Sequence, residues 1–265
     1  MRPGDSRSKG RIFVSIVSHG HDDLLPLLLD DLAKQPRDMI QRVLITHNLP
    51  PARRLNSPAL KPHMVMVDEW VNSSAQGFSS NHNSALKMLD RQLGLEATDW
   101  FLVVNPDIRL NDESLVKLGL RTDRQSGIVA PLVLSNTGHP SDAARDLPTP
   151  MNLIHRYMFR RRNSESPIWF AGMFLAIRVA CWRELAGFDE SYFLYCEDVD
   201  FCLRARIAGW PLRHETQSTV SHQAQRASHY SIQHFLWHAQ SLLRLWSSSS
   251  YRSVKALSSA RHHRI

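Results

Sequence analysis

The sequence predicts one large α/β domain built on a doubly wound, mainly parallel sheet. Three observations support this fold class. Short apolar runs alternate with segments of helical spacing over the first hundred residues. The apolar runs are continuous, as in strands that are buried on both faces. The chain has 265 residues, 43% of them hydrophobic, which is enough to bury one full core.

The elements of the first half alternate regularly. We expect strands at residues 12–18, 41–46, 64–67 and 100–104, and helices at 24–34 and from a polar turn at 72–83 through 89. In an open α/β sheet the ligand crevice lies outside the carboxyl ends of the strands. The residues that follow the strands are therefore the first candidates for binding, namely Ser18, His19, Asn48 and residues 105–107.

The second half is less regular. We expect a helix capped by residues 111–114, strands at 127–131 and 169–178, a strand end at 220–222, and an amphipathic helix at 229–246. Residues 135–167 carry Pro, Ser and Asp and then a basic run at 160–162, which indicates a loop or flap. We divide the chain into a disordered basic tail (1–10), a main domain (11–228), and a C-terminal helix with a basic tail (229–265).

The stretch at 187–206 carries the strongest chemical signal. An aromatic run leads into Glu197, Asp198 and Asp200, which fall in or just before the first turn of a helix. An ordinary reason for such acids is a well-capped helix with solvated carboxylates and an ion pair from Asp200 to Arg204. The preceding aromatic residues instead favour a partly enclosed carboxylate, whose pKa can be tuned for proton abstraction.

Residues 187–190, 193–206 and 208–210 together closely resemble glycosyltransferase family 2, and most of all its bacterial rhamnosyltransferase-like branch. The resemblance covers roughly residues 12–246. It implies a GT-A fold with a mixed sheet and a C-terminal helical extension. It further implies inverting transfer of a sugar, with rhamnose as one candidate, in bacterial surface polysaccharide biosynthesis. The implied base is Asp198, with Glu197 as its supporting neighbour.

The resemblance also implies a divalent metal, Mg²⁺ or Mn²⁺. Residues 105–107 (Asn-Pro-Asp) match the family's variant of an Asp-X-Asp metal motif, in which Asp107 would bind the ion. His222 resembles a strand-end histidine that completes the metal shell in some members. By residue type alone both could instead be structural, because Asn-Pro-Asp is good turn chemistry and a lone histidine often only packs.

The implied donor is a nucleotide sugar, dTDP- or UDP-linked, and the acceptor is a saccharide or a lipid-linked saccharide. The candidate donor-binding residues are Ser18, His19, Asn48, Asn72, Gly77, Asn81, Asn83, Asn105, Gly172 and Arg178. Two departures from the family pattern stand out. The spacing from Asn72 to Gly77 is longer than usual. The second strand ends in Thr46-His47-Asn48, so no carboxylate is available where relatives carry an Asp.

The charge of the chain limits the classes of molecule that it is expected to bind. The net charge is +7 and the pI about 9.7, which suits a phosphorylated substrate, an anionic membrane face or nucleic acid. Lys and Arg are scattered rather than arranged in one stripe, so nucleic acid is disfavoured. A non-catalytic relative that binds sugar nucleotides stays open as an alternative.

The sequence also bears on location. The three cysteines show no metal-ligand or disulfide spacing, which fits a reducing cytoplasm. We see no spanning apolar run and no export signal. We expect a cytoplasmic protein, peripheral at the inner face of the membrane. The helix at 229–246 and the basic tail would then contact anionic lipid, although such a helix can equally pack on the domain.

Overall fold

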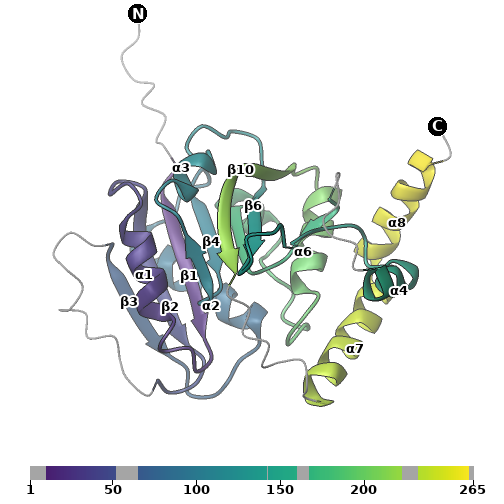
Figure 1. The fold of residues 1–265 in the computed structure, drawn as a ribbon, viewed down its shortest axis with the longest axis horizontal. Helices are drawn as coiled ribbons and strands as arrows, with labels where there is room; N and C mark the ends of the chain where they lie inside the picture. Colours follow the sequence, from purple (N-terminus) through teal and green to yellow (C-terminus); the bar gives the residue numbers. More distant parts are fainter. Residues whose placement is uncertain (1–9, 52–64, 142, 160–166, 223–231, 263–265) are drawn as a thin grey trace, which may run out of the picture.

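A mixed eight-stranded sheet forms the centre of the protein, as the computed structural model shows (Figure 1). The structure describes all residues except 1–9, 52–64, 142, 160–166, 223–231 and 263–265. The strand order is β3-β2-β1-β4-β9-β6-β10-β5. The strands are β1 (Ile12–Ser18), β2 (Ile40–His47), β3 (Val67–Val71), β4 (Trp100–Val104), β5 (Ile108–Leu110), β6 (Ile128–Ser135), β9 (Phe174–Arg178) and β10 (Leu212–His222). The predicted α/β class is confirmed.

Strand directions place many strand ends together. β1 runs parallel to β2 and β4, β2 to β3, and β6 to β10. β9 lies antiparallel between β4 and β6, and β5 lies antiparallel to β10. The carboxyl ends of β1, β2, β3, β4, β6 and β10 therefore meet at one edge of the sheet, which we call the carboxyl edge. This is the edge at which ligands of open α/β sheets bind.

Helices pack on the sheet and at one of its ends. They are α1 (Leu25–Ala33), α2 (Phe78–Leu93), α3 (Ser114–Lys117), α4 (Pro150–Phe159), α5 (Val179–Glu184), α6 (Glu197–Ile207), α7 (Ile232–Ser247) and α8 (Ser249–His262). Right-handed crossovers place α1, between β1 and β2, and α2, between β3 and β4, on opposite faces of the sheet. Between these layers β1 and β4 are buried almost throughout, as their continuous apolar runs predict.

The third strand differs from its prediction. We expected it at 64–67, but β3 covers Val67–Val71, and residue 64 lies outside the described residues. The strand extends past the predicted end through Asp68 and Glu69. Both acids meet cations or histidine from β2: Arg42 binds Asp68 (Nη1–Oδ1 3.1 Å) and His47 binds Glu69.

The segment at 135–167 holds more structure than expected. It contains β7 (Ala144–Arg145) and helix α4. β7 pairs with β8 (Trp169–Phe170) in a small second sheet. The single strand predicted at 169–178 is thus split into β8 and β9 by a turn that contains Gly172.

The C-terminal region is helical beyond its prediction. α7 agrees with the helix predicted at 229–246, of which residues 229–231 lie outside the described part. Where we expected only a basic tail, α8 packs against α6 and buries Tyr251 and Val254. Ser250 Oγ donates a hydrogen bond to Asp200 Oδ1 (3.0 Å). In the part of the chain that the structure describes, no helix is long and apolar enough to cross a bilayer.

Candidate active site

Asp107 and His222 meet at the carboxyl edge. The antiparallel pairing of β5 with β10 sets Ile108 opposite His222, so the preceding Asp107 lies next to the histidine. His222 Nε2 and Asp107 Oδ2 are 2.9 Å apart, and each side chain is about one-fifth exposed. The other carboxylate oxygen of Asp107 is buried without a hydrogen-bond partner among the described residues. The two residues predicted for the metal are therefore adjacent, with an acceptor oxygen left over.

A divalent ion fits this pair only if the protein and the donor's diphosphate both coordinate it. No group of three His, Cys, Asp or Glu side chains suited to a metal occurs among the described residues. Mg²⁺ commonly takes one or two carboxylates from a protein and completes its shell with water and substrate phosphates. Asp107 supplies the carboxylate of that pattern, and the adjacent nitrogen of His222 would be a further ligand, with the rest of the shell left to a diphosphate.

The start of α6 is held in an unusual backbone conformation. Tyr195 (φ 71°) and Cys196 (φ 67°) both adopt the left-handed region, although neither is glycine. Such residues cost about 1–3 kcal/mol each and persist where surrounding contacts enforce them. Here the contacts come from α7, since Tyr195 Oη hydrogen-bonds His234 Nδ1 (2.9 Å). Just after this strained turn, Asp198 reaches the turn that precedes β9.

Asp198 is bound by backbone amides. Its Oδ2 accepts the N–H of Gly172 (2.8 Å), in the turn between β8 and β9, and its Oδ1 accepts the N–H of Val199 (2.8 Å). The same turn reaches the metal pair, because Asn105, two residues before Asp107, donates its N–H to Met173 O (2.9 Å). Gly172, Asn105, Asp107 and Asp198 thus lie along one continuous stretch of the carboxyl edge.

Glu197 and Asp198 differ in what surrounds their carboxylates. Glu197 is buried, and its Oε2 has no hydrogen-bond partner among the described residues. Burial raises the pKa of Glu197 well above its ordinary value, and the neighbouring charge of Asp198 raises it further. Burial also raises the pKa of Asp198, but the Gly172 N–H and the charge of Arg145 oppose that shift. The two backbone amides that Asp198 accepts favour its charged form, whereas Glu197 Oε2 has no such contact among the described residues.

These carboxylates line a pocket of about 620 Å³. Its other walls come from β7, β8, α4 and the inner side of α7, through Arg145, Trp169, Leu153, Tyr195, His238 and Leu242. The guanidinium of Arg145 lies over the Trp169 ring, 4.8 Å from its centroid. A largely apolar pocket with an indole wall and two acids suits a ring whose hydroxyl must be deprotonated.

A second group of polar residues gathers where β1, β2 and β3 end. Asn48 Oδ1 accepts hydrogen bonds from Asn72 Nδ2 (2.9 Å) and from the Gln76 N–H (2.7 Å). Asn48 Nδ2 also contacts His19 Nδ1 (3.2 Å), and Asn72 Nδ2 donates to Asn81 Oδ1 (2.7 Å). The structure therefore unites four of the predicted donor-binding residues. Their amides hold the polar turn between β3 and α2 against the carboxyl edge.

Ser18 and Gly77 have mainly positioning contacts in this region. The buried Ser18 Oγ accepts the N–H of His21 (3.2 Å) and so closes the turn after β1. Gly77 precedes α2, and a Cβ there would come within 2.7 Å of the carbonyl oxygen of Phe193. Gly77 thus allows α2 to approach the aromatic run that leads into α6, which joins the two polar groups of the site.

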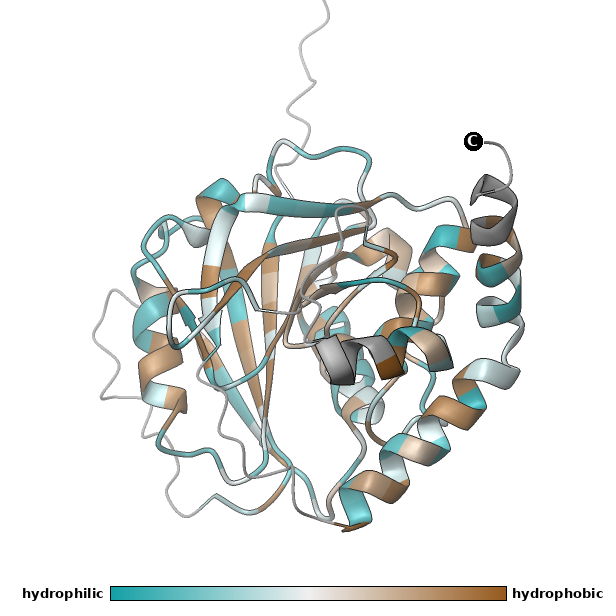
Figure 2. Cartoon of the chain, turned by 45° about the vertical axis from the view of Figure 1, so that its right-hand side comes forward, coloured by the Kyte–Doolittle hydropathy of each residue, from teal (hydrophilic) through white to brown (hydrophobic). Residues whose placement is uncertain are grey.

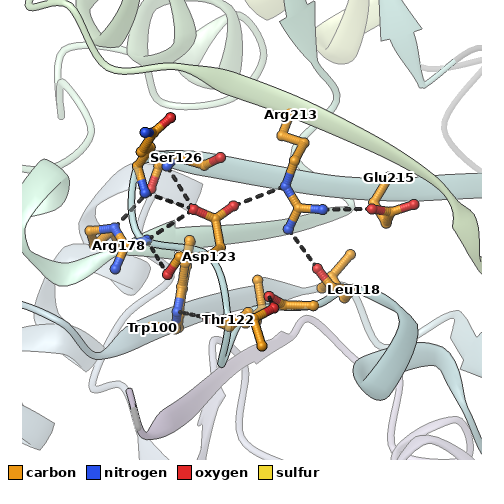
Figure 3. Close-up of polar contacts among 11 residues, drawn as sticks. Trp100, Leu118, Thr122, Asp123, Ser126, Arg178, Arg213 and Glu215 are labelled. Carbon is orange, nitrogen blue, oxygen red and sulfur yellow. Dashed lines mark hydrogen bonds and ion pairs between the residues drawn. The ribbon is translucent and has the colours of Figure 1, made fainter. Parts of the chain in front are cut away.

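Two predicted donor-binding residues lie elsewhere. Asn83 Nδ2 donates to Phe188 O (2.9 Å) and to Glu190 Oε1 (2.8 Å), so it fastens α2 to the turn before α6. Arg178 ends β9, which is antiparallel, and is paired with Trp100 at the start of β4. It therefore lies at the edge opposite the carboxyl edge, beside Trp100, Asp123 and Ser126 (Figure 3). This location corrects the expectation that Arg178 contacts the donor.

The sequence analysis did not name three residues that lie at the candidate site, namely Glu69, Arg145 and Trp169. Glu69 of β3 lies 2.9 Å from His47 (Oε2–Nε2), so a neighbouring strand supplies a carboxylate where the second strand lacks one. Glu69 was not identified because the third strand was predicted at 64–67 and so ended before it. Arg145 and Trp169 lie in a segment that we expected to be a loop and in a strand with no visible partner. Only the β7–β8 pairing could have revealed them.

No family model matches the chain, but individual proteins of known sequence do. It is 26% identical to the rhamnosyltransferase WbbL of Escherichia coli over 247 residues, 88% of this chain and 91% of that protein. It is 30% identical over 162 residues to the N-acetylglucosaminyl-diphospho-decaprenol L-rhamnosyltransferase of Mycobacterium tuberculosis, covering 51% of this chain and 52% of that enzyme. The predicted resemblance to rhamnosyltransferases is confirmed.

Solved structures agree on the fold. A mannosyltransferase from Pyrobaculum calidifontis, in complex with GDP-Man and Mn²⁺, aligns with a TM-score of 0.57 at 15% identity, over 96% of this chain and 76% of its own. The S. aureus protein TarS, residues 1–349 with UDP-GlcNAc, aligns with a TM-score of 0.58 at 16% identity, over 90% of this chain and 67% of its own. These similarities place the chain among GT-A folds.

Proposed function

We propose that this chain, a glycosyltransferase of the GT-A fold, inverts the anomeric centre as it moves a hexosyl group to an acceptor hydroxyl. The candidate donor is a dTDP- or UDP-linked sugar, with rhamnose favoured because the two relatives above are rhamnosyltransferases. The acceptor is a saccharide or lipid-linked saccharide of a bacterial surface polysaccharide. One observation carries the proposal: Asp198, whose carboxylate accepts two backbone amides, lines a pocket of about 620 Å³ beside the carboxyl edge.

Asp198 acts as the general base. Its carboxylate takes the proton of the acceptor hydroxyl, and the freed oxygen attacks the anomeric carbon from the side opposite the nucleotide. The bond from that carbon to the diphosphate breaks, and its electron pair stays on the diphosphate oxygen. A base works best with a pKa near the working pH, and burial moves the pKa of Asp198 upward in that direction.

Glu197 supports this role from the buried side. A second anion next to Asp198 would raise the pKa of both carboxyls and weaken the charge available to the acceptor. Because Glu197 is buried without a partner for Oε2, it takes up a proton more readily than Asp198 does. The pair thus keeps one negative charge, and that charge faces the pocket.

The donor's diphosphate belongs beside Asp107 and His222. These two residues would hold Mg²⁺ or Mn²⁺, which, when bound, offsets the charge that develops on the leaving nucleotide. The nucleoside would lie along the ends of β1, β2 and β3. There Asn48 and Asn72 offer amide groups, and Glu69 with His47 offers the carboxylate that the second strand itself lacks.

The direct test measures both halves of the reaction. Thermal shift with a panel of nucleotide sugars and Mn²⁺ should single out one nucleotide. Transfer, or slow hydrolysis of that donor, should then require Asp198. Binding of a nucleotide sugar without any turnover, on soluble or lipid-linked acceptors, would favour a non-catalytic binding protein.

We also propose that the protein works at the inner face of the cytoplasmic membrane as a peripheral protein. The mycobacterial relative is named for a decaprenol-linked substrate, and such a substrate is held in a bilayer. An enzyme acting on a similar acceptor needs access to the membrane surface from the cytoplasm, where nucleotide sugars are made.

A further inference from the structure

The outward side of α7 carries an exposed apolar stripe. Ile232 is 80% exposed, Phe235 71%, Leu236 58% and Leu243 65%. Their spacings of three, four and eleven residues place them along one side of the helix. Figure 2 shows the hydrophobic colour of these turns at the lower edge of the molecule. Single exposed apolar residues are ordinary, but a row along one helix marks an interaction surface.

The exposed stripe is not the side through which α7 packs on its own domain. α7 already docks through its other side: Leu245 is buried, Ser241 Oγ donates to Leu194 O (2.9 Å), and Trp237 packs near Phe193 with centroids 5.0 Å apart. These contacts hold the helix on the aromatic run before α6. Its second apolar side therefore faces outward in the folded protein.

Helix α4 extends the same surface. Its Met151 is 60% exposed and Ile154 51% exposed. Trp246 Nε1 donates to Pro148 O (2.8 Å), which ties the end of α7 to the segment that leads into α4. We define the apolar face as Met151, Ile154, Ile232, Phe235, Leu236 and Leu243. Leu153 of α4 and Leu242 of α7 line the pocket of Asp198, so that pocket lies directly between the two helices.

The charge of these segments is one-sided. No Asp or Glu occurs after Glu215, and none occurs at 147–164. Together these two segments hold ten of the chain's 32 Lys and Arg residues and none of its 25 acids. Helices α4 and α7 themselves carry no acid, and an apolar helix face within such a basic part of the chain is suited to adsorb to anionic lipid.

A second copy of the chain suits this surface poorly. A two-fold interface sets the same patch against itself, so the cations would meet cations. An anionic bilayer satisfies both properties at once, because its headgroups are negative and its interior is apolar. The surface therefore favours lipid over self-association.

We infer that the apolar face of α4 and α7 inserts at the surface of an anionic membrane, so that the pocket of Asp198 receives an acceptor whose hydrocarbon chain stays in the bilayer. The inference about the acceptor rests on the proposed function. The inference about the membrane does not. It also moves the contact away from the basic tail, because α8 packs on α6 through Tyr251 and Val254.

Point variants test this better than truncation, since removing α8 would uncover α6. In the full chain, Phe235→Ser, Leu236→Ser and Leu243→Ser should together weaken co-sedimentation with phosphatidylglycerol-containing vesicles by at least about tenfold. None of the three lines the pocket. The matched control is Met66→Ser with Val116→Ser, which removes apolar groups that are 60% and 51% exposed elsewhere and should leave binding unchanged.

The outcomes separate the two proposals. Unchanged vesicle binding in the triple variant, or equal binding of the wild type to neutral phosphatidylcholine vesicles, would overturn the membrane inference. So would a concentration-dependent dimer that the triple variant abolishes in sedimentation velocity. With a short soluble acceptor the triple variant should keep its turnover, and it should lose turnover with a lipid-linked acceptor in vesicles. Absence of all transfer with normal vesicle binding would instead overturn the proposed function alone.

Discussion

Two charged clusters lie at opposite edges of the same sheet, and they differ in how completely their atoms are paired. Around Asp123, Arg178 donates to the Ser126 carbonyl (2.8 Å), and Arg213 binds Asp123 (2.9 Å) and Glu215 (2.6 Å) (Figure 3). At the carboxyl edge, Asp107 meets only His222 among the described side chains, and Glu197 meets no donor through Oε2.

The difference lies in the unpaired atoms. Among the described residues, no buried side-chain oxygen or nitrogen of Asp123, Arg178 or Arg213 lacks a partner, whereas Asp107 Oδ1 and Glu197 Oε2 do. Buried polar atoms are normally paired, so the exceptions call for a ligand or a proton. We therefore expect the paired cluster around Asp123 to stabilise the fold, and the unpaired oxygens of Asp107 and Glu197 to serve a ligand or a proton.

The sharpest test of this contrast is Asp198→Asn. We expect turnover to fall by at least about a hundredfold, because general base catalysis contributes on that scale. Donor affinity and thermal stability should change little, since an amide can still accept the Gly172 N–H. Asp200→Asn is the matched control: Asp200 pairs with Arg204 and Ser250, so its loss should reduce stability more than turnover per folded molecule. Near-normal turnover of Asp198→Asn would shift attention to Glu197.

Asp123→Asn should give the opposite result. Removing one charge from a buried pair typically costs about 3 kcal/mol of folding free energy. Asp123 is 8% exposed and binds two arginines. Urea unfolding should show this loss, while turnover per folded molecule stays close to that of the wild type. A specific loss of turnover would mean that the paired cluster also serves the reaction.

Asp107→Ala should lower the affinity for a nucleoside diphosphate in the presence of Mn²⁺ by about tenfold or more, because one ligand of the shared ion is lost. His222→Ala should give a smaller loss of the same kind. Calorimetry with and without Mn²⁺ measures both. Equal affinities with and without metal, in wild type and variant alike, would leave Asp107 as a turn residue.

The smallest effect is a pH dependence of stability from Glu197. Its pKa is raised in the folded state, so its contribution is fully present below the ordinary glutamate pKa of about 4.3 and is lost as pH rises through the folded value. Glu197→Gln removes this loss. The melting temperature of the variant should therefore gain on the wild type as pH increases from about 4 to about 8. Parallel curves would mean that Glu197 is ionised without cost.

The sequence predicted the elements that local patterns determine. Continuous apolar runs located β1 and β4, and the acids after an aromatic run located the start of α6. The bounds of β3 were missed because its acids depend on Arg42 and His47 from the neighbouring strand. α8 was missed because its serine-rich sequence has no strong apolar periodicity, and its burial comes from contact with α6.

In the candidate site, too, residue identities could be predicted from the sequence, whereas their contacts could not. Asp107 and His222 are far apart in the chain, and residue types together with a family resemblance were enough to name both. Their contact, however, depends on the register of β5 against β10. Arg178 was expected near the donor from the family resemblance, but its strand β9 is antiparallel, so Arg178 lies at the opposite edge. Strand direction is a long-range property that spacing within one segment does not report.

The bond from Ser250 to Asp200 bears on the order in which the protein forms during synthesis. Chains emerge from the ribosome N-terminus first, and early segments begin to fold before later ones exist. The sheet and α6 would then be present while Tyr251 and Val254 are still in the exit tunnel, with one flank of α6 uncovered. The helix that carries Asp198 therefore gains its packing partner α8 only after that later segment has emerged, and a nascent chain halted before α8 would leave one flank of α6 exposed.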